Sequence, residues 1–295
     1  MNKYKFLQID AFTTTPFKGN PCAVVLDADN LTSADMLNIA KEMNLSETAF
    51  LLKGQKSDFK ARYFTPNEEI PLAGHPTIAL SHALVELRLI DISNQHSSFT
   101  LELPAGIITV FLKSLNSQLF ITMRQLKPKF LSLHDPKCIA PLFHLKEEDF
   151  VSSVPIQTIS TGTPQLMMQV KNKSILDAAF MNTKLYQQYK TTSDFFSPHI
   201  FCIEKQGSQQ VTHARHFGVA PDILEDPFTG SASGGMSAFL WKHKQLEQAE
   251  FTAYQGENLG RLGVAKLKVF GSREDIDYVE ITGQAVTLIR GEICL

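Results

Sequence analysis

The sequence predicts an α+β fold of two similar halves, in each of which short strands wrap around one main buried helix. Residues 61–84 and 214–240 share one order of features: an Ala-Arg-x-Phe segment, a loop closed by Gly, and an apolar run. Two upstream matches recur in the same order, between residues 19–21 and 162–164 and between residues 46–52 and 197–203. Each match alone is common turn chemistry, but the ordered set indicates a duplication.

Runs rich in Phe, Ile, Val, Leu and Thr predict the strands of the first half. These runs lie at residues 5–12, 22–26, 48–53, 58–65, 99–103, 106–112 and 118–123. A helix is predicted over residues 33–43, because Thr32 and Asp35 have the spacing of a capping box. Met36, Ile39 and Met43 would share one apolar face of this helix.

A second helix is predicted over residues 76–89, since Pro76 suits the first turn of a helix. In the second half, a helix is predicted from Ser231 to Lys244. The strands around it are predicted at residues 165–170, 199–204, 211–217, 264–270, 277–282 and 285–290. The expected domains are residues 1–125, completed by the last strand at about 285–295, and residues 126–284. Residues 126–129 and 136–141 are rich in Pro and Lys and are expected to be linkers.

Composition narrows the classes of function. The chain has 295 residues, enough for two domains that each bury a core. A formal net charge of -2 gives no basic field for nucleic acid. The first residues lack the apolar core of a signal peptide, and no apolar run reaches the roughly 18 residues of a membrane span. We therefore expect a cytoplasmic protein with no nucleic-acid or membrane partner.

Metal and redox motifs are not expected. The cysteines, Cys22, Cys138, Cys202 and Cys294, are scattered without C-x-x-C spacing. The histidine pairs 213/216 and 75/82 have no third ligand nearby in sequence. The glycine-rich segment 230–235 lacks the Gly-Lys-Ser/Thr ending of a phosphate loop, and it is not the G-x-S-x-G elbow of a serine hydrolase.

The duplicated helix starts predict a binding site. The helices that follow Gly74 and Gly230 begin with backbone N–H groups that have no intrahelical partner, and such ends bind anions. Two similar ends in a duplicated protein suggest a cleft between the halves that holds a small anionic ligand.

Differences between the two copies mark candidate residues. Glu47 stands where the second copy has Pro198, and it is a candidate general base; the commoner fate of such a residue is an exposed Glu at a strand end. His75 stands where the second copy has Ser231, and it either donates to a bound anion or caps the helix. Asp226 is a third candidate, for which a turn-forming role is the alternative.

Several motifs together resemble the phenazine-biosynthesis PhzF-like isomerase family across nearly the whole chain. They are Asp10-Ala11-Phe12, Gly19-Asn20-Pro21, Ser46-Glu47-Thr48, Arg62 to Glu68, Gly74-His75-Pro76-Thr77, Glu225-Asp226-Pro227 and Thr229-Gly230-Ser231-Ala232. The resemblance implies the fold of diaminopimelate epimerase: two similar domains, each a barrel-like, mostly antiparallel sheet around a central helix, with the active site between them. It also implies a homodimer.

The resemblance also implies roles for the candidate residues. Glu47 would be the acid/base of a cofactor-free isomerisation of a dihydro-hydroxyanthranilate. His75, Asp226 and Ser231 would bind the substrate, and the helix starts at Gly74 and Gly230 would hold its carboxylate.

Related epimerases carry two catalytic cysteines at positions that hold Ala73 and Thr229 here, so a two-thiol racemase is disfavoured. A one-base epimerase of an amino or hydroxy acid and a non-catalytic binding protein remain as alternatives.

Overall fold

The computed structural model describes residues 2–92, 96–218 and 224–295, so each predicted domain range contains one short gap. The described chain is an α+β fold in which strands predominate and helices are few, as the sequence predicted. None of the helices in these ranges has both the length and the apolar character that crossing a bilayer requires.

The first half contains a continuous run of paired strands. Its strands are β1 (Lys3–Ala11), β2 (Asn20–Val25), β3 (Glu47–Lys53), β4 (Phe59–Phe64), β5 (Glu69–Ile70), β6 (His96–Leu103), β7 (Gly106–Leu115) and β8 (Gln118–Gln125). Strand β2 pairs antiparallel with β1 and parallel with β3, β4 pairs antiparallel with β3 and parallel with β6, and β7 pairs antiparallel with β6 and β8. The last strand, β18 (Ala285–Cys294), returns to pair antiparallel with β1.

The second half repeats this order of pairings. Its strands are β9 (Lys129–His134), β10 (Ile156–Ser160), β11 (Pro164–Gln169), β12 (Ser197–Gln206), β13 (Gln209–Phe217), β14 (Glu225–Asp226), β15 (Glu250–Gln255), β16 (Gly263–Gly271) and β17 (Ile276–Gly283). The β11–β12 and β13–β15 pairs are parallel, like β2–β3 and β4–β6. This repeat supports the duplication, while the domain boundaries remain a prediction.

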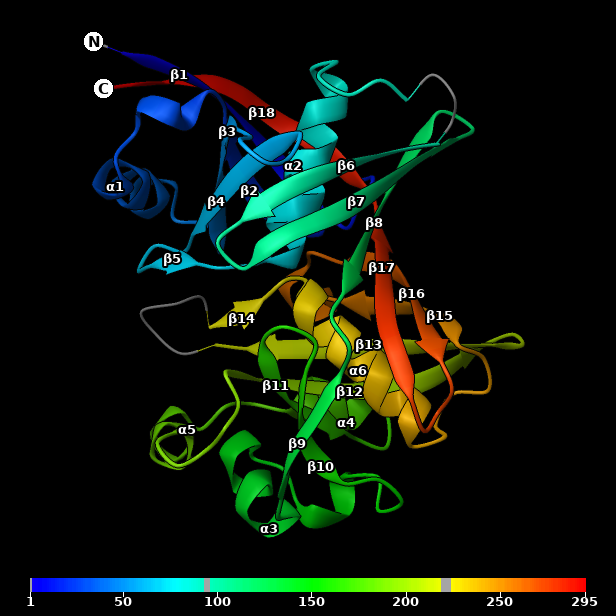
Figure 1. Cartoon of the computed structure of the whole chain (residues 1–295). Coiled ribbons are helices and arrows are strands. Elements are labelled where there is room, and N and C mark those ends of the chain that lie inside the picture. Colours follow the sequence, from blue (N-terminus) through cyan, green and yellow to red (C-terminus); the bar gives the residue numbers. More distant parts are fainter. Residues whose placement is uncertain (1, 93–95, 219–223) are drawn as a thin grey trace.

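One sheet runs through both halves, because β8 and β17 pair antiparallel where the halves meet (Figure 1). In the described residues the strands do not close into a barrel. Each half instead curves around one long helix, α2 (Gly74–Glu86) in the first and α6 (Gly230–Lys242) in the second (Figure 1).

Both central helices are buried on nearly all sides, which is typical of core helices. Ile78 and Leu80 of α2 lie in the same hydrophobic cluster as Met236 and Phe239 of α6. The two helices are therefore parts of one continuous core, and their relative position is fixed by packing.

The helix α1 (Ser33–Met43) has the predicted bounds and capping box. Thr32 Oγ1 accepts a hydrogen bond from the Asp35 N–H at 3.1 Å, and Asp35 Oδ2 accepts one from the Thr32 N–H at 3.0 Å. Met36 and Ile39 are buried on the predicted face.

Some predicted elements differ from the structure. Helix α2 begins two residues before Pro76, and the predicted linker at 136–141 contains the helix α3 (Pro136–Ile139) and a 3₁₀ turn. The reason is local: the Asp135 side chain accepts a hydrogen bond from the Lys137 N–H and caps the turn, and proline is favoured at a helix start. Lys129, placed in a linker, begins β9. The short helices α4 (Lys173–Ala178) and α5 (Thr183–Lys190) and the strands β9, β10 and β15 were not predicted.

Candidate active site

The starts of the two central helices meet where the halves join. A Cβ atom placed on Gly74 would lie 3.1 Å from the Cα of Gly230, so the two backbones are close together and a larger residue at Gly74 would push against Gly230. The side chains of the residues before them, Ala73 and Thr229, accept no capping hydrogen bond from the helices. Two positive helix ends therefore lie together, each equivalent to roughly half a unit charge.

A cavity of about 380 Å³ lies beside the helix starts and is lined by both halves. All the residues predicted for the site line it: Glu47, Gly74, His75, Asp226, Gly230 and Ser231. The structure thus brings together residues that are up to 184 positions apart in the sequence (47 to 231). Their roles in binding and catalysis remain predictions.

Glu47 and His75 are in contact at the wall of this cavity. The carboxylate Oε2 of Glu47 lies 3.2 Å from Nε2 of His75, and the two side chains are 19% and 4% exposed. Burial lowers the pKa of His75 to about 4, and the charge of Asp226 opposes this effect. The ring of His75 is therefore neutral at neutral pH.

Asn20 determines which nitrogen of His75 carries the proton. The amide nitrogen Nδ2 of Asn20, which can only donate, lies 3.1 Å from Nδ1 of His75. The two hydrogens of Nδ2 are shared with the closer acceptors Asp226 Oδ1, at 2.8 Å, and the Phe228 carbonyl oxygen, at 2.9 Å. Because Nδ2 cannot accept a hydrogen bond, Nδ1 of the neutral ring is assigned as the unprotonated nitrogen and Nε2, which faces Glu47, as the protonated one. The N–H of His75 thus lies beside the carboxylate of Glu47, but it forms no hydrogen bond with a described residue.

Asp226 is held by donors from both halves. It accepts hydrogen bonds from Asn20 Nδ2 at 2.8 Å, from Ser46 Oγ at 3.1 Å, and from Thr229 Oγ1. Asn20 is fully buried and also donates to the carbonyl oxygen of Phe228 at 2.9 Å. The carboxylate of Asp226 is therefore fixed across the junction of the halves, which is more than the turn-forming role weighed for it.

Sequence analysis assigned no site role to several polar residues that surround the predicted ones. They are Asn20, Ser46, Gln165, Ser197 and His216. A signal was present, because all of them lie in or next to the segments that recur between the halves. The repeats do not predict which of these side chains contact one another.

Thiols and metal ligands do not form a site in the described part of the chain. Cys22 and Cys202 are buried, and Cys138 and Cys294 are exposed. Burial, with a contribution from the charge of Glu47, raises the pKa of the Cys22 thiol well above its usual range. Within residues 2–92, 96–218 and 224–295, no group of three or more His, Cys, Asp or Glu side chains is arranged to hold a metal ion.

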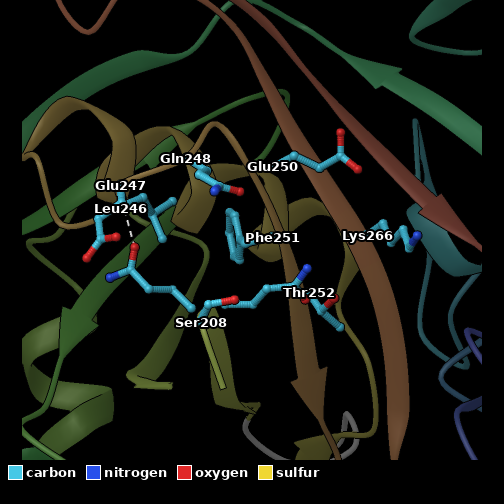
Figure 2. Close-up of a pocket in the computed structure, with 10 residues that line it drawn as sticks. Ser208, Leu246, Glu247, Gln248, Glu250, Phe251, Thr252 and Lys266 are labelled. Atoms are coloured by element: carbon cyan, nitrogen blue, oxygen red, sulfur yellow. Dashed lines mark hydrogen bonds between the residues drawn. The ribbon is translucent and has the colours of Figure 1, made fainter. Parts of the chain in front are cut away.

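A further cavity, of about 350 Å³, lies in the second half (Figure 2). It is lined by Ser208, by Leu246 to Gln248 and by residues of β13, β15 and β16, with Phe251 among them (Figure 2). Gln210 accepts a hydrogen bond here from the Glu247 N–H at 2.7 Å. None of the predicted site residues belongs to its described lining, so the cavity at the helix starts is the better candidate for the active site.

Comparison with known proteins agrees with the resemblance found in the sequence. The family model described as phenazine biosynthesis-like protein matches residues 9–291. An uncharacterized isomerase of Clostridium acetobutylicum is 33% identical, over 100% of this chain and 99% of the relative. A trans-2,3-dihydro-3-hydroxyanthranilate isomerase of Pseudomonas fluorescens is 32% identical, over 99% of this chain and 100% of the relative.

The solved structures include a phenazine biosynthesis protein of the PhzF family from Bacillus anthracis. It matches this fold with a TM-score of 0.89 at 32% identity, over 100% of both chains. The match extends through both halves and includes the strands and helices that position the cavity. The chain therefore belongs to the family of phenazine biosynthesis-like proteins, and it is an isomerase.

Proposed function

We propose that this isomerase moves a proton between two carbons of a small carboxylate substrate without a cofactor, and that Glu47 carries the proton. The observation behind this proposal is the 3.2 Å contact between Glu47 Oε2 and His75 Nε2, in a cavity shared by both halves. The contact places the carboxylate of Glu47 beside a buried, neutral ring, although it is not itself a hydrogen bond. Hydrogen bonds of catalytic groups often become well aligned only when substrate is bound.

The proposed substrate is of the dihydro-hydroxyanthranilate type, as the name of the Pseudomonas fluorescens relative suggests. A cavity of about 380 Å³ suits a single-ring compound. The two helix starts would bind the substrate carboxylate through backbone N–H groups and would stabilise negative charge that develops during the reaction.

In the proposed reaction, the ionised Glu47 removes a proton from one ring carbon, and the electron pair of that C–H bond shifts into the adjacent π system. The protonated Glu47 then returns the proton to another carbon of the same system, so that no proton is gained or lost overall. His75 would orient the carboxylate, while Asp226 and Ser231 would hold polar groups of the substrate.

The test uses trans-2,3-dihydro-3-hydroxyanthranilate in deuterated water. Wild-type protein should convert it and place deuterium on the carbon that receives the proton. The Glu47→Gln variant should lose both conversion and exchange, with a melting temperature close to that of wild type. The control is Glu68→Gln, which makes the same chemical change at an exposed residue of the cavity wall and should keep the activity.

Turnover of Glu47→Gln above a few per cent of wild type would show that another group carries the proton. Deuterium returned to the original carbon with inverted configuration would instead identify the alternative, a one-base epimerase. The proposal also includes a homodimer in the cytoplasm, which light scattering of the purified protein and fractionation of the cells that produce it would check.

A further inference from the structure

The wall of the active-site cavity that belongs to the second half carries a chain of buried polar side chains. Gln165, Ser197 and His216 all line the cavity and are only 2%, 5% and 5% exposed. They come from the start of β11, the start of β12 and the end of β13, which are neighbouring strands. None of the three was needed to explain proton transfer by Glu47.

The hydrogen bonds of this chain have a defined direction. Ser197 Oγ donates its single proton to Gln165 Oε1 at 2.6 Å, so Nε2 of His216, 2.8 Å from the same hydroxyl, must be the donor to it. Burial lowers the pKa of His216 to about 4, so the ring is neutral and its Nδ1 carries no proton. Nδ1 lies 3.3 Å from Nδ1 of His199, which can donate to it.

This direction determines what Gln165 presents to the cavity. Its Oε1 is occupied by Ser197, and its amide nitrogen has two N–H groups without a hydrogen-bond partner among the described residues. This nitrogen is not among the buried side-chain atoms that lack a partner, so it is open to the cavity and not sealed in the core. A residue that is 98% buried, lines a cavity and keeps two free donors is therefore positioned for an acceptor on a ligand.

The charge of the cavity explains why such a neutral donor matters. Its described wall contains four carboxylates, Glu47, Glu68, Glu69 and Asp226, and no Lys or Arg. Oxygen atoms of a substrate must then be bound by neutral donors, which are N–H groups and hydroxyl groups such as that of Ser231. The helix starts at Gly74 and Gly230 can hold a carboxylate, and Gln165 remains for a second oxygen.

We propose that Gln165 is a specificity-determining residue, which donates a hydrogen bond to a hydroxyl or carbonyl oxygen that the ring substrate carries in addition to its carboxylate. This inference rests on the proposed function. Gln165 would favour ring carboxylates that carry a second oxygen substituent. A ligand without that oxygen would leave the amide of Gln165 without a hydrogen-bond partner.

Two stable ligands that differ by one hydroxyl test this role. Wild-type protein should bind 3-hydroxyanthranilate about tenfold more tightly than anthranilate in isothermal titration calorimetry, the value of one hydrogen bond. The Gln165→Leu variant should bind both ligands equally, with an affinity for anthranilate close to that of wild type. Ser197→Ala, which removes the hydroxyl that orients Gln165, should reduce the preference partly, and it serves as the second test if Gln165→Leu does not fold.

Two outcomes separate the inference from the proposed function. If Gln165→Leu keeps the tenfold preference, or weakens both ligands by the same factor, Gln165 does not read the second oxygen and the inference is wrong, while Glu47-dependent exchange can still stand. If neither ligand binds wild-type protein, the substrate class itself is wrong and both proposals fall.

Discussion

The burial of His75 should make the stability of the protein depend on pH within a defined window. Burial lowers the pKa of this ring from 6.5 to about 4, so between these values the unfolded chain binds more protons than the folded one. The free energy of unfolding must then rise as the pH rises from about 4 to about 6.5. Above that range the neutral His75 makes its full contribution to the free energy of unfolding. It amounts to about 3 kcal/mol over the whole window and to about 2 kcal/mol between pH 7 and pH 5.

The perturbation is His75→Gln, because Gln retains a neutral acceptor and a neutral donor at this place but cannot be protonated. Urea unfolding at pH 7 and pH 5 should show that wild-type protein loses about 2 kcal/mol more than the variant on acidification. The control replaces His96, an exposed histidine, with Gln and should behave like wild type. Equal losses in wild type and His75→Gln would refute the argument that a buried, neutral His75 faces Glu47.

Three further predictions concern thiols, glycines and Asn20. Alkylation of the exposed Cys138 and Cys294 should leave isomerase activity intact, and rapid inactivation that substrate prevents would revive a thiol mechanism. Gly74→Ala should lower kcat/KM at least tenfold and lower the free energy of unfolding in urea by about 1–3 kcal/mol, because the new Cβ would press on the Gly230 backbone. If both quantities stay near those of wild type, the helix starts can separate freely. Asn20→Ala should destabilise by about 1–3 kcal/mol and slow turnover, since it removes buried donors, and a change below about 0.5 kcal/mol would contradict the bridging role.

Local signals explain what the sequence could predict of the fold. The bounds of α1 were predictable because a capping box is a contact between residues three apart, Thr32 and Asp35, and needs no tertiary structure. The Asn residues that cap α4 and α5, Asn172 and Asn182, carry a similar local signal that sequence analysis overlooked. The strand β9 has no such signal, because Leu133 in it is 67% exposed and the strand depends on its pairing with β10.

The site was predictable only in part, for a related reason. Glu47 and His75 stood out because the two copies differ there, and that comparison needs no coordinates. The role of Asn20 depends on a hydrogen bond to Asp226, which is 206 positions away in the sequence. A contact of this range exists only once both halves have folded and docked, so the recurring segment around Asn20 marked the residue but could not indicate its partner.

The two halves keep the same scaffold at the junction. Each has an ion pair between an Arg on the strand before the helix and a Glu that pairs with that strand. The pairs are Arg62 Nε with Glu69 at 2.7 Å, and Arg215 Nε with Glu225 at 2.8 Å. In both halves the central helix begins five residues after this Glu. The position of the helix start relative to the ion pair is therefore the same in both halves.

The residues that face the cavity have diverged on this common scaffold. The residue after the ion-paired Glu is Ile70 in the first half and Asp226 in the second half. At the position after the first Gly of the central helix, the first half has His75 and the second half has Ser231. The candidate base, Glu47, belongs to the first half alone. Because the candidate base, Glu47, comes from one half and the anchored carboxylate of Asp226 from the other, we infer that a substrate between the halves meets the proposed proton carrier on one side only. This arrangement suits the movement of a proton along one face of a ring better than exchange between two opposed bases.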